Sequence, residues 1–201
     1  MYAERLSSSL AFALAVALVY YILSMETVLA LLLAVTAHEL AHVIVLRMVG
    51  LRVKRLRLEL TGLCIDYCGY ACPVGHAAAA LAGPAGGLAY AYFASLLARR
   101  LSCGWLEVSS GLSLLLSLFN MLPVIPLDGG RIAVQLLQKL LGERSGNRAA
   151  GFLGLAVSLL LSAAGLLLAL QGKGTGLLIA GVWLLLSQNA GQGIVKKREL
   201  L

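Results

Sequence analysis

The stretch Ala37-His38-Glu39-Leu40-Ala41-His42 organises the fold, because it sets two imidazoles and a carboxylate inside an otherwise apolar helix. His38 and His42 are four residues apart, so on a helix both side chains lie on one face and can reach one ion, while Glu39 projects beside them. This is the spacing found in zinc hydrolases. The alternative is a polar packing contact, in which His38 and Glu39 satisfy each other or a neighbouring helix. An ionisable group at mid-membrane costs about 2.5–3.5 kcal/mol on insertion scales, which favours a functional role.

The composition around this stretch is that of a membrane protein. The 201 residues are 60% hydrophobic and only 12% charged, with a mean hydropathy of +0.91, which is too apolar for a water-soluble domain of this length. Crossing a hydrocarbon core about 30 Å thick takes about 20 residues of helix. The sequence therefore predicts an all-α polytopic membrane protein with about six transmembrane helices, forming one domain over residues 1–201 with no appended soluble domain. The expected spans are the charge-poor runs Leu6–Met25, Thr27–Leu46 (which contains Glu39), Tyr67–Ala98, Val108–Leu127, Ala149–Gly172 and Gly174–Val195.

The distribution of positive charge predicts the orientation. A net charge of +7 is compatible with a nucleic-acid partner, but aromatic residues are few and the charges lie next to the spans, so no nucleic acid is expected. With the N-terminus inside, thirteen lysines and arginines fall on the cytoplasmic side and only Arg99, Arg100 and Lys173 fall outside. We therefore expect a multi-pass protein of the cell membrane with both termini in the cytoplasm. Glu4 weakens the positive segment before the first run, which favours a retained helix over a signal peptide.

The segment Leu51–Cys72, between the second and third spans, has a different character. Apolar and charged residues alternate over much of it and Thr61-Gly62 suggests a turn, so we expect a short β-hairpin on the cytoplasmic face. An interfacial basic helix is the alternative, because Lys and Arg also suit lipid headgroups. Cys64, Cys68 and Cys72 are expected to be free thiols in a reducing compartment, as is Cys103; the alternative is a second, weak metal or redox site that recruits His76.

The third span carries small residues spaced four apart, which predicts close packing against another helix. These residues are Ala79, Gly83, Gly87, Ala91 and Ser95. Pro84 lies among them and is expected to kink or interrupt the helix.

The stretch Asn120–Arg131 contains two prolines and two glycines in a run that is still apolar, so we expect irregular backbone there. Such backbone is tolerated at membrane depth only where protein or a water-filled cavity surrounds it. Asp128 lies at its end, and one role open to it is to cap a helix that starts near Gly130. A two-histidine site, however, needs a third protein ligand, and catalytic zinc commonly takes a carboxylate. Asp128 is therefore our expected third ligand, with His38 and His42, for one Zn²⁺ per chain.

Two motifs together resemble the site-2 protease family of intramembrane zinc metalloproteases. They are His38–His42 and the segment from Asn120 to Gly130 with Pro123, Pro126 and Asp128. The arrangement of a short chain with its HExxH motif in the second of six spans is most similar to the stage IV sporulation intramembrane protease subgroup. That resemblance implies cleavage of the pro-sequence of a late mother-cell sigma factor. The chain departs from the family in lacking an asparagine soon after Gly83-Pro84, and it shows no nucleotide-sensing domain or PDZ-like insertion, so those features are not carried over.

The chemistry we expect is hydrolysis of a peptide bond by a zinc-bound water, with Glu39 as general base and proton shuttle. Zinc lowers the pKa of its bound water to about 7, so a neighbouring carboxylate can take the proton near neutral pH. A helical substrate must unwind to be cut, and the stretch Asn120–Leu127 and the edge of the hairpin are suited to hold it extended. Asn120 and Pro123 are therefore expected to bind substrate, although Asn120 has an alternative role as a helix cap. The expected partners are a membrane-associated or single-span protein substrate, the lipid bilayer and a membrane regulatory protein.

Two other functions fit part of this pattern. A membrane transporter of zinc or protons would also place histidine and acidic side chains inside a helical bundle. A catalytically inactive relative that binds a membrane partner would keep the fold. The register of the HExxH motif favours the protease, because a transport site needs ligands but no separate base beside one of them.

Overall fold

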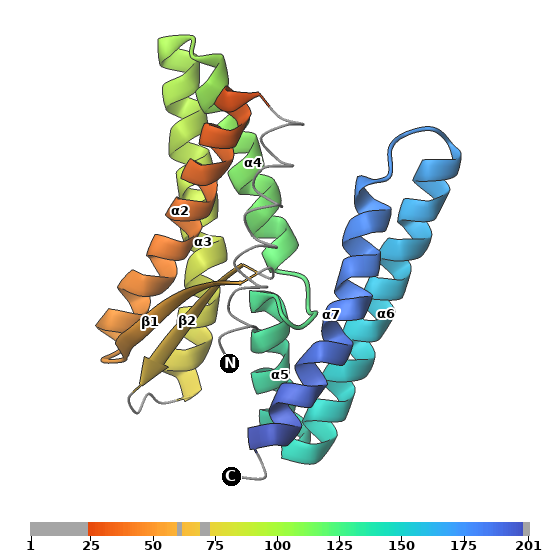
Figure 1. Ribbon diagram of the computed structural model, residues 1–201. Helices are drawn as coiled ribbons and strands as arrows, with labels where there is room; N and C mark the ends of the chain where they lie inside the picture. Colours follow the sequence, from red (N-terminus) through yellow and green to blue (C-terminus); the bar gives the residue numbers. More distant parts are fainter. Residues whose placement is uncertain (1–23, 60–61, 69–72, 199–201) are drawn as a thin grey trace, which may run out of the picture. The chain divides into compact units, whose positions relative to one another are not determined.

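The computed structural model describes residues 24–59, 62–68 and 73–198 (Figure 1). In that part of the chain the elements are α2 (Met25–Met48), β1 (Arg52–Glu59), β2 (Gly62–Cys68), α3 (Pro73–Leu101), α4 (Gly104–Asn120), α5 (Asp128–Leu141), α6 (Glu143–Leu170) and α7 (Gly176–Arg198). The chain divides into two compact units, Met1–Leu118 and Phe119–Leu201.

Three of the described helices are long and apolar enough to cross a membrane: α2, α3 over Gly75–Leu101, and α6. The prediction of six spans is not supported. The run Leu6–Met25 lies almost entirely outside the described residues, α4 has only 17 residues, and the apolar part of α7 is the shorter stretch Gly176–Gln188. The physical reason is that a charge-free run measures apolarity rather than helix length. Part of the run Val108–Leu127, for example, forms the irregular segment between α4 and α5.

The first unit is arranged as expected for helices that face lipid. Most of its buried positions carry small or polar side chains, whereas many of its large apolar side chains are exposed. In α2, Ala30 and Ala34 are fully buried while Leu29 and Leu32 are more than half exposed. Without a hydrophobic drive between helices in a bilayer, small residues at the contact allow close approach and better packing. This arrangement, together with the apolar helices, supports a location in a membrane.

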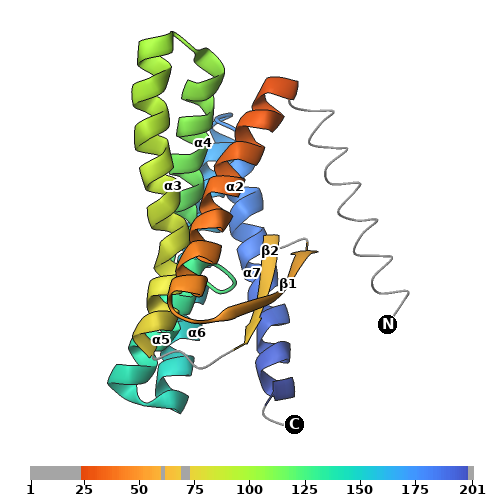
Figure 2. The ribbon, with the colours of Figure 1, turned by 90° about the vertical axis from the view of Figure 1, so that its left-hand side faces the viewer.

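Helices α2 and α3 lie side by side, as the two views show (Figures 1 and 2). A methyl group added at Gly86 of α3 would collide with the Cβ atom of Ala41 in α2, so the two backbones are very close. The packing role predicted for the small residues of this helix is confirmed for Ala79 and Gly83, which meet α2, and for Gly87, which meets α4. Pro84 lies within α3 without ending it, so of the two predicted effects the interruption is wrong and the kink stays a prediction.

Buried hydroxyl groups tie α4 to its neighbours. Their Oγ atoms donate to backbone carbonyls: Ser109 to Ala30 at 2.9 Å, Ser110 to Ala91 at 2.7 Å and Ser113 to Gly87 at 2.9 Å. A hydroxyl group buried in an apolar environment needs such a partner, and small residues on the neighbouring helices let it reach their carbonyls. The short helix α4 is thus held by hydrogen bonds as well as by packing.

Between α2 and α3 the described residues form strands rather than the alternative basic helix. Strands β1 and β2 pair antiparallel, with Arg52 opposite Cys68 and Glu59 opposite Gly62, and the register is irregular between Val53 and Arg55. Helix α3 accordingly starts at Pro73, later than the charge-free run that begins at Tyr67. The thiol predicted at Cys72 lies outside the described residues.

The second unit is built on the pair α6 and α7, with α5 packed against α6. Gly165 and Gly181 allow the pair to approach closely, because a Cβ atom at Gly165 would lie 2.5 Å from the Cα atom of Leu178 and one at Gly181 would lie 2.6 Å from Ser162 Oγ. The core of this unit joins the segment after α4 to these helices through the buried residues Val124, Leu127 and Leu184. The irregular segment is therefore fixed to a rigid support.

Candidate metal centre

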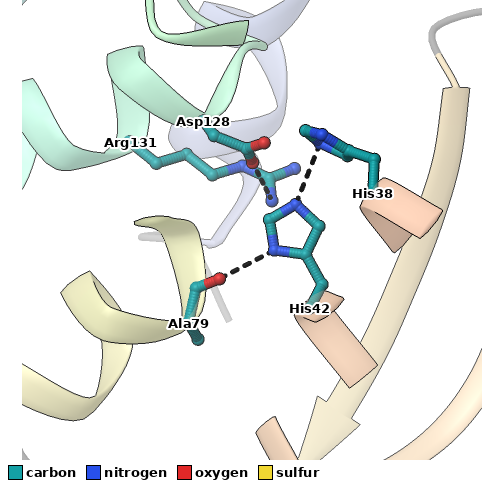
Figure 3. Close-up of polar contacts among 5 residues, drawn as sticks. All are labelled: His38, His42, Ala79, Asp128 and Arg131. Atoms are coloured by element: carbon teal, nitrogen blue, oxygen red, sulfur yellow. Dashed lines mark hydrogen bonds and ion pairs between the residues drawn. The ribbon is translucent and has the colours of Figure 1, made fainter. Parts of the chain in front are cut away.

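The two histidines of α2 point into the first unit. His38 is 3% exposed and His42 is 8% exposed, whereas Leu40 and Ile44 on other faces of the same helix are about half exposed. The Nε2 atoms of the two imidazoles lie 3.3 Å apart (Figure 3). The spacing of four residues thus brings together the two ring nitrogens that the sequence predicted.

The distance between these nitrogens fits a shared metal ion. Two nitrogens bound to tetrahedral zinc at about 2.0–2.1 Å each lie about 3.3 Å apart. The observed Nε2–Nε2 distance is 3.3 Å, which matches that separation.

A backbone carbonyl of α3 orients His42. Its Nδ1 atom lies 2.7 Å from the carbonyl oxygen of Ala79 (Figure 3). A carbonyl oxygen only accepts, so Nδ1 carries the proton, and in the neutral imidazole the lone pair then lies on Nε2. Metal-binding histidines usually donate their other ring N–H in this way, which fixes the ring and the tautomer.

Glu39 is half-buried on α2, next to His38 in the chain. At one residue from His38 it does not share the face on which His38 and His42 meet. Its carboxylate is thus placed beside the donor pair instead of within it, as a base acting on a bound water requires.

In the second unit, Asp128 is the first residue of α5 and is 6% exposed. The N-cap of α5 is Leu127, so the alternative role of Asp128 as the cap of this helix is wrong: the helix starts two residues before the expected Gly130. Arg131 Nη1 lies 3.6 Å from Asp128 Oδ1, one helical turn on (Figure 3). The guanidinium supplies positive charge to a carboxylate that is otherwise removed from solvent.

The segment between α4 and α5 is irregular, as its prolines and glycines predicted. The N–H group of Val124 donates to the carbonyl of Leu122, and that of Leu127 donates to the carbonyl of Val124, each at 2.8 Å. Asn120 is the last residue of α4, and Pro123 is half-buried within the segment. Both predicted substrate-binding residues therefore lie at the start of this irregular backbone.

Gly129 and Gly130 let the start of α5 press against that segment. A Cβ atom at Gly129 would lie 2.6 Å from the carbonyl oxygen of Leu122, and one at Gly130 would lie 2.6 Å from the amide nitrogen of Ile125. Backbone atoms cannot move aside as a flexible side chain can. The two glycines after Asp128 are thus required by packing, and they fix the carboxylate to the irregular segment.

Sequence reasoning did not find Ala79 and Gly83 as part of this site, nor Arg131. The small residues spaced four apart indicated that α3 packs closely. They could not indicate which backbone carbonyl accepts a hydrogen bond, because every residue has one. Arg131 entered only the count of positive charges that predicts the membrane orientation. Its spacing of three residues from Asp128 does, however, favour an ion pair on a helix.

A pair of buried imidazoles on an apolar helix, oriented by a backbone carbonyl and with a glutamate next in the chain, is typical of an HExxH-type metal centre in a membrane protein. Residues 101–164 match the family model described as Peptidase family M50. That match covers α4, the irregular segment with Asp128, α5 and much of α6.

Two further comparisons agree with this match. The chain is 37% identical over 182 residues to a protein of Mycobacterium tuberculosis, in the strains Erdman and H37Rv, that is named provisionally as the zinc metalloprotease Rip3. The aligned part is 84% of this chain and 44% of that relative, so the chain spans less than half of the relative's length. The fold is similar to that of the Site-2 Protease from Methanocaldococcus jannaschii, with a TM-score of 0.67 and 21% identity over 92% of this chain and 87% of the other.

The matched family model is that of a peptidase and the relative is named as a zinc metalloprotease, and these similarities indicate zinc as the metal. The imidazole pair described above fits that ion. The comparisons do not bear on the sporulation subgroup or on a sigma-factor substrate.

Proposed function

We propose that this chain is an intramembrane zinc metalloendopeptidase that hydrolyses a peptide bond of a membrane-associated or single-span protein. The observation that carries the proposal is the pair of Nε2 atoms of the buried His38 and His42, which lie 3.3 Å apart. The family similarity and the relative named for zinc metalloprotease activity support it.

Asp128 is the third protein ligand in this proposal. Asp128 supplies a buried carboxylate at the first position of α5. Two histidines and a carboxylate are a common ligand set of catalytic zinc, with the fourth position left for water. The proposal requires the two units to act as one metalloprotease domain, since the histidines come from the first unit and the aspartate from the second.

Glu39 is the catalytic residue. Zinc held by His38, His42 and Asp128 would lower the pKa of a water and would polarise the scissile carbonyl. The Glu39 carboxylate would take a proton from the attacking water and return it to the amine that leaves. Glu39 is an acid–base group and not a ligand, so its loss should stop catalysis without releasing the metal.

The irregular segment after α4 receives the substrate. A transmembrane helix hides its peptide bonds in its own hydrogen bonds, so the cleaved region must be extended. Pro123 and Pro126 have no N–H group, and the carbonyls of this segment are suited to accept bonds from an extended chain. The side-chain amide of Asn120 adds a donor at the start of the same segment.

The cellular setting follows from the charges. Both termini, the hairpin β1–β2 and helix α5 are proposed to be cytoplasmic, as the distribution of lysines and arginines indicates. The pro-sequence of a sporulation sigma factor is the narrower substrate implied by resemblance alone, and a membrane regulatory protein is the further partner.

The test is co-expression with tagged single-span proteins, comparing the wild type with Glu39→Gln. Glu26→Gln is the matched control, because it makes the same change on the exposed first turn of the same helix. Wild type and Glu26→Gln should cleave a substrate, and Glu39→Gln should keep its zinc without cleaving. A zinc or proton transporter would instead move ions in all three proteins with no substrate cleaved, and that result would overturn the proposal.

A further inference from the structure

Gly83 faces the two ring nitrogens of the metal site. A Cβ atom built on it would collide with His42 Nε2 and would lie 2.6 Å from His38 Nε2 and 2.6 Å from His42 Cδ2. Ordinary contacts of a Cβ atom are 3.4–4 Å. The face of α3 at Gly83 is therefore directed at the two atoms that would bind the ion.

The imidazoles have little freedom to move away. Both side chains are buried, and His42 is held by the 2.7 Å bond from its Nδ1 atom to the carbonyl of Ala79. Ala79 lies one turn before Gly83 on the same helix, so both positions face α2. One turn of α3 fixes Nδ1 of His42, and the next leaves space at Nε2.

Neighbouring glycines of α3 have different surroundings. A methyl group at Gly86 would meet the Cβ atom of Ala41 in α2, and one at Gly87 would meet the hydroxyl oxygen of Ser117 in α4. Those positions account for close packing of helices. At Gly83, in contrast, the three nearest atoms all belong to the imidazoles of His38 and His42. Close packing of helices alone does not explain this.

We propose that Gly83 is a positioning residue of the metal site: the missing side chain keeps both Nε2 lone pairs directed at one point and leaves room there for the ion. The inference rests on the proposed zinc site and adds α3 to the elements that shape it. A methyl group at this position should turn the rings apart and lower the affinity for metal, although it removes no ligand.

The first experiment compares Gly83→Ala with Gly86→Ala in the full-length protein, purified in detergent. Both add one methyl group to a tightly packed face of α3, but only the first meets the imidazoles. Zinc affinity is measured by competition with a chelator, and the ligand geometry by the visible spectrum of the Co²⁺ form. Gly83→Ala should bind zinc about 10–100-fold more weakly, the range typical for residues that orient ligands, and should change the Co²⁺ spectrum. Gly86→Ala should keep the wild-type affinity and spectrum.

Equal affinity in Gly83→Ala and wild type would overturn the inference, and so would an equal loss in both variants, which would make Gly83 a packing residue. Failure of the wild type to bind zinc would instead overturn the proposed function.

A second experiment needs no metal and applies even if Gly83→Ala folds poorly. The thermal midpoint is measured with chelator present in two backgrounds, the wild type and the double variant His38→Ala/His42→Ala. If the added methyl group collides with the rings, Gly83→Ala should lower the midpoint much less in the histidine-free background, while Gly86→Ala should lower it equally in both. Equal shifts for Gly83→Ala in the two backgrounds would show that no such collision exists.

Discussion

The imidazole of His42 and the carbonyl of Ala79 are joined by a 2.7 Å hydrogen bond between α2 and α3. The bond from His42 therefore serves two purposes: it orients a ligand, and it connects two helices in an apolar environment.

This bond gives a prediction for the protein without metal. His42→Ala should lower the free energy of unfolding by at least about 1 kcal/mol, because it removes a hydrogen bond between helices. Thermal or denaturant unfolding in detergent with a chelator measures this. Equal stability of His42→Ala and the wild type would show that the bond to Ala79 adds nothing to the fold.

Removal of the proposed third ligand is the next prediction. Asp128→Ala should lose most of its zinc and its protease activity, whereas Asp66→Ala, which changes the only other aspartate of the chain, should lose neither. Metal analysis of the purified variants provides the measurement. Full zinc and full activity in Asp128→Ala would remove Asp128 from the site and return the third ligand to another residue.

The hydroxyl groups of α4 give a prediction about stability. Ser109 is fully buried, donates to the carbonyl of Ala30 and lies 2.8 Å from the hydroxyl oxygen of Tyr90. Ser109→Ala should therefore destabilise the protein by about 0.6–2 kcal/mol, the range measured for hydrogen bonds between membrane helices. Ser95→Ala is the control, because Ser95 bonds only within its own helix to the carbonyl of Tyr92 among the bonds seen here. A similar loss in both variants would assign the effect to helix propensity.

Much of this site could be predicted from the sequence, because its ligands follow a local rule. The spacing of His38 and His42 fixes a common helical face whatever the rest of the chain does. The prolines and glycines near Asp128 likewise mark irregular backbone, since they exclude a continuous helix by their own geometry. These features depend on few neighbours in the chain.

The parts that could not be predicted depend on distant residues. The carbonyl of Ala79 and the open face of Gly83 matter only because α3 packs on α2, and no local pattern shows which turn of α3 meets the imidazoles. Six spans were expected, but three helices of the described part of the chain are long and apolar enough to cross a membrane, because a run without charges indicates apolarity and not helix length. The start of α5 at Asp128 instead of Gly130 was also not predicted. It depends on how Gly129 and Gly130 pack against the irregular segment, and not on the helix alone.

The proposed orientation can be tested with reporters. Fusions of a reporter enzyme after Leu201 and after Ser102 should give opposite signals, cytoplasmic for the first and external for the second. The physical basis is the excess of lysine and arginine next to the ends proposed to be inside. Identical signals at both sites would require a different number of spans between them.

The last prediction compares two glycine substitutions that should change the stability of the protein in opposite directions. Gly151 lies in α6, and a Cβ atom there would meet no atom within 4 Å. Gly151→Ala should therefore stabilise the protein by about 0.5–1 kcal/mol, because alanine loses less conformational freedom in a helix. Gly129 instead faces the backbone of Met121 and Leu122, so Gly129→Ala should destabilise the protein by about 1–3 kcal/mol, the usual cost of overpacking.

Gly129→Ala also tests the candidate metal site, because Gly129 follows Asp128 in the chain. If the glycine fixes the carboxylate to the irregular segment, Gly129→Ala should lose zinc as well as stability, and Gly151→Ala should lose neither. Thermal unfolding in detergent and metal analysis of the same preparations measure both effects. A stable, zinc-loaded Gly129→Ala would mean that the segment and the start of α5 move apart at little cost, and that the position of Asp128 does not depend on their close contact.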